Sequence, residues 1–395
     1  MQQINYGIIG TGYFGAELGR IVNTLPGAAV SRVYDPVNGS AVAAELGCSA
    51  ASGVADVTDH ADVDVVVVAS PNHAHREPVE LAARAGKPVF CEKPIALSFT
   101  DCQAMLAATA DAGVLFMAGH VMNFMNGVRA AKQWISEGAI GDLVYCHTAR
   151  NGWEGPQPSV SWKKQRALSG GHLYHHIHEL DLMQFLMGPA QTVTMVGGNV
   201  AHHGTQFGDE DDLLLIALEF ADNRYGLLEY GSAFRWPEHY VLIQGTAGAI
   251  RIDLQDVGVE LRTPIRHERL LLHRSPEEDQ DRKRFYGLGD ASTDGAIMYG
   301  DPSKTPPLWL RGIMEMEIAY FDGLLRGQLP DPEFTALTDG TAATAVIATA
   351  DALTRSLREG RKVEVSEVTA GSTPGNDTHQ TSDQRGPATY ERCLS

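Results

Sequence analysis

Four histidines stand within seven residues of this chain, at His172, His175, His176 and His178. Imidazole titrates near neutral pH, so a histidine beside a substrate can take up a proton and return it. A second polar segment contains Lys93, and an ammonium beside a reacting hydroxyl stabilises the negative charge that develops on its oxygen. These residue types predict proton transfer at a hydroxyl group.

The histidine cluster has two other interpretations. His172 and His176 have the i, i+4 spacing of a metal pair, but the sequence lacks an HExxH pattern, and its five cysteines form no CxxC pair. A helix face without function is disfavoured because so many partly polar rings are costly to bury without partners. We therefore predict no metal and assign the cluster to catalysis or ligand binding.

A glycine-rich turn indicates a nucleotide. The residues Gly10, Gly12, Tyr13, Phe14 and Gly15 belong to a GxGxxG pattern that follows an apolar run and opens a helix. Such glycines allow a tight turn and let the backbone approach a pyrophosphate at the helix N-terminus. Asp35 follows 20 residues after Gly15, where a carboxylate binds a ribose 2′-hydroxyl and repels a 2′-phosphate. The pattern predicts NAD rather than NADP, a preference that Arg32 would weaken if it faced the ribose.

The elements that position these residues fall into two halves. Strand-like runs at 4–10, 28–35, 63–70, 87–93 and 114–121 alternate with helical stretches, which predicts βαβ units and a doubly wound parallel sheet. After an amphipathic helix at 126–141, longer alternating runs at 143–150, 192–203, 212–222, 224–234, 239–253 and 258–263 predict a large open, mostly antiparallel sheet. Helices are expected at 308–325 and 339–357. The fold class is thus α/β joined to α+β.

We expect a dinucleotide-binding Rossmann domain over 1–122, a substrate-binding α+β domain over 123–367 and a disordered tail over 368–395. Residues 264–306 are expected to form a surface excursion, with the charge run 277–284 as a solvated loop.

Composition restricts the partners and the location. The formal net charge of −18 repels phosphate backbones and anionic lipid, so nucleic acid and membranes are disfavoured as partners. No apolar run of about 18 residues is present to span a bilayer. The N-terminus has no signal-peptide pattern and the cysteines are odd in number and scattered, so we expect a cytoplasmic protein.

The motifs together carry a family resemblance. GTGYFG at 10–15, SPNHAH at 70–75, EKP at 92–94 and the predicted open sheet resemble the Gfo/Idh/MocA family of sugar and polyol oxidoreductases, over about residues 4 to 365. The resemblance implies that the glycine loop holds the pyrophosphate. It further implies that Ser70, Asn72 and His75 lie along the cofactor, and that Glu92 and Lys93 line the nicotinamide site.

The family's second signature is a glycine-rich turn followed by D-x-x-x-H-x-x-D. His178 and Asp181 match it, whereas Tyr174 stands where the family has its first Asp. By this resemblance His178 is the expected general base, with Lys93 as its partner and His175 as a second candidate. Tyr174, His175 and His176 are expected to bind sugar hydroxyls, and Asp181 to orient a neighbour or bind sugar. On a continuous helix His175, His178 and Asp181 would share one face.

Further substrate contacts are expected from the loop that covers the substrate in this family and from the end of the first domain. Ordinary packing or solvation is an equal alternative for the loop residues. Asn123 replaces a common arginine, which would remove one partner of an anionic substrate. The expected set is His120, Asn123, Arg150, Asn151, Trp153, Trp162 and Lys163.

Three functions follow. The first is an NAD-dependent dehydrogenase acting on a secondary hydroxyl of a sugar, glycoside or cyclitol. The resemblance further implies oxidation at C3 of a glucoside, which gives a 3-keto sugar. The second is a glycosidase that uses bound NAD transiently with no net redox. The third is a non-catalytic NAD-binding sensor, which the retained Lys93 and histidines disfavour. The resemblance also implies a homo-oligomer, a dimer or a tetramer.

Overall fold

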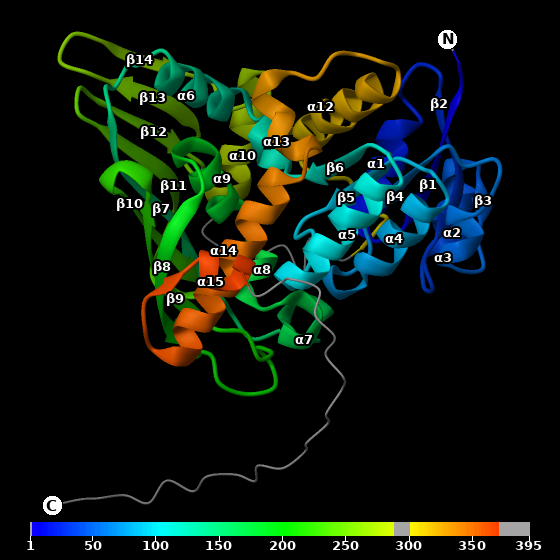
Figure 1. The fold of residues 1–395 in the computed structure, drawn as a ribbon, viewed down its shortest axis with the longest axis horizontal. Coiled ribbons are helices and arrows are strands. Elements are labelled where there is room, and N and C mark those ends of the chain that lie inside the picture. The colour runs from blue at the N-terminus through cyan, green and yellow to red at the C-terminus, as the bar shows by residue number, and fades with distance from the viewer. Residues whose placement is uncertain (1, 158, 288–300, 371–395) are drawn as a thin grey trace, which may run out of the picture.

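The computed structural model describes residues 2–157, 159–287 and 301–370, and these form two sheets with helices around and between them (Figure 1). The six-stranded sheet lies toward the N-terminus and the nine-stranded sheet at the opposite side of the molecule (Figure 1). Helix α12 (Leu308–Leu325) packs against α1 of the first half, and α14 (Thr341–Glu359) packs against both α5 and β8.

The first sheet is fully parallel, with strand order β3-β2-β1-β4-β5-β6. The order reverses between β1 and β4, and ligands of open α/β sheets bind at that switch point. Its strands are β1 Ile4–Ile9, β2 Ala28–Tyr34, β3 Ser49–Ala50, β4 Val65–Val68, β5 Val89–Glu92 and β6 Phe116–Gly119. Its helices are α1 Tyr13–Val22, α2 Gly39–Leu46, α3 Val54–Thr58, α4 Arg76–Arg84 and α5 Phe99–Asp111, with the 3-10 turn η1 Asn72–Ala74.

The local sequence explains this half. The four valines of β4 are all buried, as expected of a central strand covered on both faces. Ser98 caps α5 by accepting a hydrogen bond from the backbone N–H of Asp101 at 3.1 Å. These features confirm the doubly wound fold predicted from the sequence.

The second sheet has the order β14-β13-β12-β11-β7-β10-β9-β8-β15. It is mostly antiparallel, as predicted, but β10 pairs with β7 in parallel, so the sheet is mixed. Its strands are β7 Leu143–Trp153, β8 Ala190–Gly198, β9 Leu213–Phe220, β10 Arg224–Gly231, β11 Ala233–Gly245, β12 Ala249–Asp253, β13 Gly258–Arg262, β14 His267–Leu270 and β15 Val363–Glu364.

The remaining elements connect and cover this sheet. The helices are α6 Asn126–Ser136, α7 Arg166–Ser169, α8 His172–His175, α9 His178–Met187, α10 Pro276–Gly287, α13 Thr335–Thr338 and α15 Ser366–Thr369. The 3-10 turns are η2 Val121–Phe124, η3 Trp162–Lys164, η4 Ala221–Asn223 and η6 Pro332–Phe334.

Two expectations about irregular segments are wrong. The charge run 277–284 belongs to α10, where Glu278 and Arg282 are buried, and 267–270 is strand β14, so this part of 264–306 is structured. The run has acids in its first half and bases in its second, and its buried positions carry polar groups, so no apolar helical period marked the helix. Residues 288–300 of the excursion lie outside the described residues.

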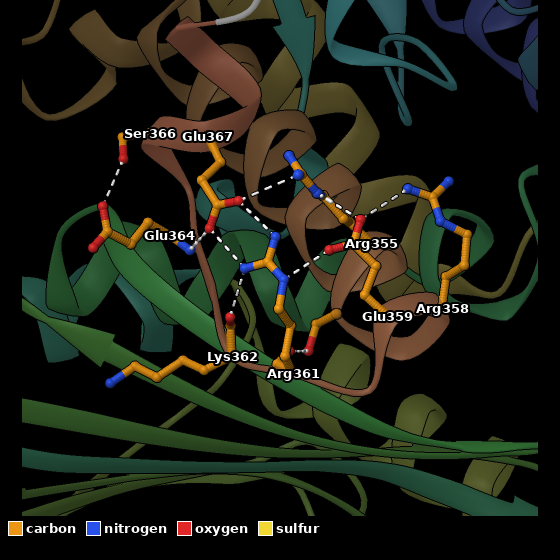
Figure 2. Close-up of polar contacts among 9 residues, drawn as sticks. Arg355, Arg358, Glu359, Arg361, Lys362, Glu364, Ser366 and Glu367 are labelled. Atoms are coloured by element: carbon orange, nitrogen blue, oxygen red, sulfur yellow. Dashed lines mark hydrogen bonds and ion pairs between the residues drawn. The ribbon is translucent and has the colours of Figure 1, made fainter.

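The expected tail begins too early, because residues 366–369 form α15 behind the edge strand β15. Figure 2 shows the polar contacts that hold this end of the chain. Arg361 forms ion pairs with Glu359 at 2.7 Å and with Glu367 at 2.7 Å, which join the end of α14 to α15. The rest of the expected tail, 371–395, lies outside the described residues.

Candidate active site

The glycine loop after β1 leaves room for a phosphate. Gly10 has φ +88°, and a Cβ there would lie 2.4 Å from the Ser70 backbone nitrogen. A Cβ on Gly15 would lie 1.9 Å from the Gly10 carbonyl oxygen, whereas a Cβ on Gly12 would meet no protein atom within 4 Å. Gly10 and Gly15 thus satisfy the fold, while Gly12 keeps open space at the N-terminus of α1, as a pyrophosphate requires. Tyr13 is buried beside this loop.

Asp35 stands at the end of β2 and holds this loop. Its carboxylate accepts hydrogen bonds from the backbone N–H groups of Thr11 at 2.9 Å and of Asn38 at 2.8 Å. Arg32, which would favour NADP if it faced the ribose, is bound instead to Asp56 and His60. The Asp35 carboxylate is thus not paired with Arg32, and this arrangement fits the 2′-hydroxyl of NAD.

The segment after β4 is fixed by side chains that bind backbone. Asn72 donates to the Ser169 carbonyl oxygen at 2.8 Å, which ties the first half of the chain to the loop before α8. His75 is buried between the carbonyl oxygens of Ser70 and Pro94, 2.9 Å from each. Asn72 and His75 therefore fix the positions of these strand ends, and their predicted contact with the cofactor stays a prediction.

Lys93 follows β5 and lines a cavity between the two halves of the chain. Its ammonium donates to the His175 carbonyl oxygen at 3.1 Å. Burial lowers the pKa of Lys93 to about 8, although the negative charge of Glu92 partly opposes this shift. Burial raises the pKa of Glu92 to about 7, although the positive charge of Lys93 partly opposes that shift. The two groups are thus close in proton affinity, which suits a site that moves protons.

The histidine segment is not one continuous helix. The backbone leaves helical geometry at His176, with φ −103° and ψ 33°, and α9 starts anew at His178. The prediction of one shared face is therefore wrong for His175, which the break separates from His178 and Asp181, both on α9. His175, His176 and His178 all line the cavity with Lys93. Burial lowers the pKa of His178 well below its ordinary value, and Lys93 adds to this, so His178 is neutral and able to accept a proton.

The cavity is strongly cationic. Arg150, Lys163 and Arg282 line it together with Lys93, and none of its described lining residues is an aspartate or glutamate. The remaining lining residues are aromatic, apolar or imidazole side chains: Phe14, Val121, Met122, Met125, His175, His176, His178, His239, Tyr286, Trp309, Leu310 and Ile313. A cavity of this charge in a chain of net charge −18 favours an anionic ligand.

The buried carboxylate of Glu179 contacts two residues that line the cavity. Glu179 is fully buried and contacts Arg150 at 3.3 Å and His239 at 2.7 Å. Burial alone would raise the pKa of Glu179, but Arg150 and the His239 hydrogen bond together hold it below its ordinary value. Tyr230 donates to the His176 carbonyl oxygen at 2.6 Å and so fixes the break before α9. Glu179 thus orients two cavity residues without entering the cavity.

Several predicted substrate residues form a layer behind the cavity. His120 Nδ1 lies 2.7 Å from Asp181 Oδ1, and Asn123 donates to Asp181 Oδ2 at 3.2 Å. All three side chains are buried and none lines the cavity. The structure therefore places these three residues behind the cavity wall and not at its surface.

The structure also separates four other predicted residues from the cavity wall. Tyr174 donates to Asp351 of α14, so it cannot take the place of the family's first Asp. Asn151 contacts Glu229 and the Glu238 backbone. Trp153 lies beneath Arg235, whose guanidinium carbon is 3.4 Å from the ring centroid. Trp162 contacts only the edge of the site, 6.5 Å from the His175 ring.

Four polar or aromatic residues of the cavity wall were not predicted from the sequence: His239 of β11, Arg282 and Tyr286 of α10, and Trp309 of α12. Nothing in their local spacing separates them from ordinary strand and surface-helix residues. The available signal was the i, i+4 spacing of Arg282 and Tyr286, which places both on one face if the charge run continues as a helix to Tyr286.

Within the described parts of the chain, no three His, Cys, Asp or Glu side chains come together as metal ligands. The rings of His172 and His176 instead pack at 4.4 Å between centroids. A search of the described helices found none long and apolar enough to cross a membrane.

Comparison with known proteins agrees with this geometry. Residues 4–120 match the family model for the NAD-binding Rossmann fold of the Gfo/Idh/MocA oxidoreductases, and residues 132–365 match the model for the C-terminal alpha/beta domain of that family. Together these models cover well over half of the chain.

Two curated relatives are similar over most of their length. A 2,7-anhydro-N-acetylneuraminate hydratase of Mediterraneibacter gnavus is 56% identical and covers 93% of this chain and 98% of its own. The hydratase of the same name from Escherichia coli is 50% identical, over 92% and 98%. Among solved structures, levoglucosan dehydrogenase in complex with NADH has a TM-score of 0.75 at 22% identity, over 92% of this chain and 99% of its own. The chain therefore belongs to the Gfo/Idh/MocA family of sugar-acting oxidoreductases and is an enzyme with an NAD-binding Rossmann domain.

Proposed function

We propose that this enzyme opens the anhydro bridge of 2,7-anhydro-N-acetylneuraminate by adding water, with transient use of bound NAD and no net redox. The observation that carries this proposal is the cavity wall of four cationic side chains, with no acid among its described lining residues. A sialic acid derivative carries a carboxylate, and that charge is stabilised in such a cavity.

The named relatives support the same reaction. Two proteins at least 50% identical to this chain over nearly their whole length carry that hydratase name. This reaction is the NAD-cycling alternative of the sequence analysis, applied to an internal glycosidic bridge.

The residues at the cavity can serve each proton step. Bound NAD supplies a reversible acceptor for the two electrons and the hydrogen of a carbinol C–H. Neutral His178 takes the hydroxyl proton while the Lys93 ammonium stabilises the developing alkoxide. The carbonyl that results acidifies the neighbouring C–H, and a second cavity histidine, His175, is placed to take that proton before the bridge opens.

The return steps use the same groups in reverse. The departing bridge oxygen receives a proton, water adds its hydroxyl to the carbon that the bridge leaves, and the carbon beside the carbonyl regains the proton that it lost. The carbonyl then regains the hydride and the hydroxyl proton and becomes the original alcohol. The sum is addition of one water, with no electron and no proton left over.

A second candidate is an NAD-dependent dehydrogenase that oxidises a neutral sugar or glycoside. In its most specific version, this enzyme oxidises the C3 hydroxyl of a glucoside. Lys93 and His178 are sufficient for that half of the cycle. The cationic wall favours the first proposal over this one.

The test uses purified enzyme, NAD at a small fraction of the substrate, and 2,7-anhydro-N-acetylneuraminate. We expect N-acetylneuraminate far in excess of the NAD added, one oxygen incorporated from labelled water, and no accumulation of NADH. Levoglucosan, a methyl glucoside and myo-inositol serve as neutral comparisons. NADH formed in proportion to a keto product from a neutral sugar would replace the hydratase with the dehydrogenase.

We also propose a homo-oligomer formed through the outer face of the nine-stranded sheet. Apolar side chains of β8, β9 and β10 point outward there, with Val196, Leu215, Tyr225 and Leu227 each more than two-fifths exposed. The molar mass in solution tests it, and a monomer at micromolar concentration would contradict it.

A further inference from the structure

Lys164 is a buried lysine that follows the cavity residue Lys163 directly in the chain, and the proposed function does not use it. It is 1% exposed, and its ammonium lies 2.8 Å from Glu154 Oε2 and 3.1 Å from Glu210 Oε2. Both glutamates are buried as well, and the three side chains form a buried ion cluster. Such clusters have a large desolvation cost, and apolar side chains of similar volume often hold a fold equally well. The geometry that the cluster imposes therefore explains it better than stability does.

The buried ion cluster joins two loops of the second half of the chain. Glu154 and Lys164 belong to the segment between β7 and α7, and Glu210 belongs to the loop between β8 and β9. The backbones of the loops also meet, because the Asp209 N–H donates to the Lys164 carbonyl oxygen at 3.1 Å. A Cβ on Gly208 would lie 2.1 Å from that oxygen, so the approach leaves no room for a side chain. The second loop thus holds both the backbone and the side chain of Lys164.

The turn η3 ends at Lys164, and its three side chains make three different contacts. Neighbouring side chains of a 3-10 helix point about 120° apart. The Lys163 ammonium lies 5.9 Å from the ring centroid of Phe14 in α1, and the Trp162 ring lies 6.5 Å from that of His175. Because one short turn carries all three side chains, fixing the direction of Lys164 also fixes the direction of Lys163.

We propose that Lys164 is a positioning residue, whose burial between Glu154 and Glu210 places Lys163 on the cavity wall. Lys163 lines the cavity and contributes one of its four cationic side chains. A turn that rotated or detached would carry this charge away from the cavity and weaken the potential that attracts an anion. The inference rests on the proposed function, which supplies the anionic substrate of the kinetic test.

The first experiment removes the link between the two loops. In Glu210→Ala the Lys164 ammonium keeps Glu154 as a partner, so its charge is not left buried without a carboxylate. We expect the KM for 2,7-anhydro-N-acetylneuraminate to rise about 10-fold and kcat to stay within about threefold. The rate of the chemical step should be kept because Lys93 and His178 come from β5 and α9, outside η3.

Glu80→Ala is the matched control. It removes a glutamate that pairs with Arg76 at 2.6 Å on α4, a helix with no residue among the described lining of the cavity. Its KM and kcat should equal those of the wild type. Glu210→Gln keeps the shape of the side chain and loses the charge, so its KM should rise by about threefold. This variant decides if Glu210→Ala is not folded, as judged by NAD affinity.

A double-mutant cycle separates positioning from a general loss of stability. Lys163→Met should raise the KM for the same substrate about 10-fold. Adding Glu210→Ala to Lys163→Met should raise the KM less than about twofold further, because Lys164 acts through Lys163. Effects on KM that multiply, or a Glu210→Ala variant with the KM of the wild type, would overturn the proposal.

Amide hydrogen exchange tests the same link without substrate. The backbone N–H groups of Lys164 and Gln165 donate to carbonyl oxygens of η3 and its N-cap, each at 3.1 Å. These amides should exchange at least about 10-fold faster in Glu210→Ala and at the wild-type rate in Glu80→Ala. Unchanged exchange in Glu210→Ala would contradict the positioning role. A wild type that does not convert the substrate contradicts the hydratase, and the exchange rates then still decide whether the buried ion cluster holds η3.

Discussion

The ammonium of Lys93 is hydrogen-bonded to the backbone carbonyl oxygen of His175, at 3.1 Å. This bond joins the end of β5, in the cofactor half of the molecule, to the helix break that places His176 and His178 in the cavity. The lysine and the histidine segment are therefore held together although Lys93 and His175 are 82 positions apart in the chain. The proposed proton transfer requires these groups to lie close together, which this hydrogen bond provides.

Replacing Lys93 tests its chemical role. In Lys93→Met we expect the rate of bound NAD reduction by substrate to fall at least about 1,000-fold, because both the charge that stabilises the alkoxide and its proton are lost. NAD affinity should stay within about threefold, measured by nucleotide fluorescence titration. Lys362→Met, an exposed ion pair with Glu219 far from the cavity, is the control and should keep the wild-type rate. A methionine variant with near-normal reduction would remove Lys93 from the mechanism.

The pH profile gives a second test of the same group. Burial lowers the pKa of Lys93 to about 8, so the ammonium form is lost as the pH rises through that value. We expect kcat/KM to fall above about pH 8 in the wild type. In Lys93→Arg the remaining activity should show no such fall, because a guanidinium does not lose its proton in this range. An unchanged alkaline limb in Lys93→Arg would assign the limb to another group.

Two substitutions in the glycine loop test cofactor binding and folding separately. A Cβ at position 12 meets no protein atom within 4 Å, so Gly12→Ala should fold normally and lose NAD affinity by at least about 10-fold, as the methyl occupies the space of the pyrophosphate. Gly15→Ala should fold poorly, because its Cβ would lie 1.9 Å from the Gly10 carbonyl oxygen. Thermal unfolding without nucleotide and calorimetric NAD titration distinguish the two effects. Normal NAD binding by Gly12→Ala would contradict the placement of the cofactor.

The sequence predicted the features that depend on local pattern. The buried valines of β4, the glycine spacing after β1 and the alternation of the later strands each follow from a period or a turn requirement. The cavity wall could not be predicted in the same way. Arg282 and His239 reach it from elements far apart in the chain, and the break at His176 depends on Tyr230 binding its carbonyl oxygen. Contacts of that kind are set by tertiary packing and leave no spacing in the sequence.

The same limit explains why several predicted substrate residues lie behind the cavity. Asp181 follows His178 at i, i+3 within α9, yet it contacts His120 and Asn123 behind the cavity wall. Asn123 was expected to weaken binding of an anion by replacing an arginine. The cationic wall supplies that charge from Arg150, Lys163 and Arg282 instead.

A buried acid behind Lys93 gives a prediction about stability. Glu317 of α12 is 0% exposed, and its carboxyl oxygens have no hydrogen-bond partner among the described residues. Burial raises the pKa of Glu317 well above its ordinary value, and the nearby Glu92 and Asp181 raise it further. The group is thus neutral in the folded enzyme at a pH where the unfolded chain is ionised.

The sign of the effect follows from proton binding. Below the unfolded pKa both states are protonated and Glu317 costs little; as the pH rises, the unfolded state gains from ionisation and the folded state does not, so stability falls. Glu317→Gln removes this penalty and should raise the unfolding midpoint more at about pH 8 than at about pH 5, in urea titrations without substrate. Asp322→Asn, on the same helix, loses bonds to Tyr6 and Arg326 and should be less stable at both pH values. A Glu317→Gln variant that loses stability more at the higher pH would mean that Glu317 is ionised, and a cation would then have to lie beside it.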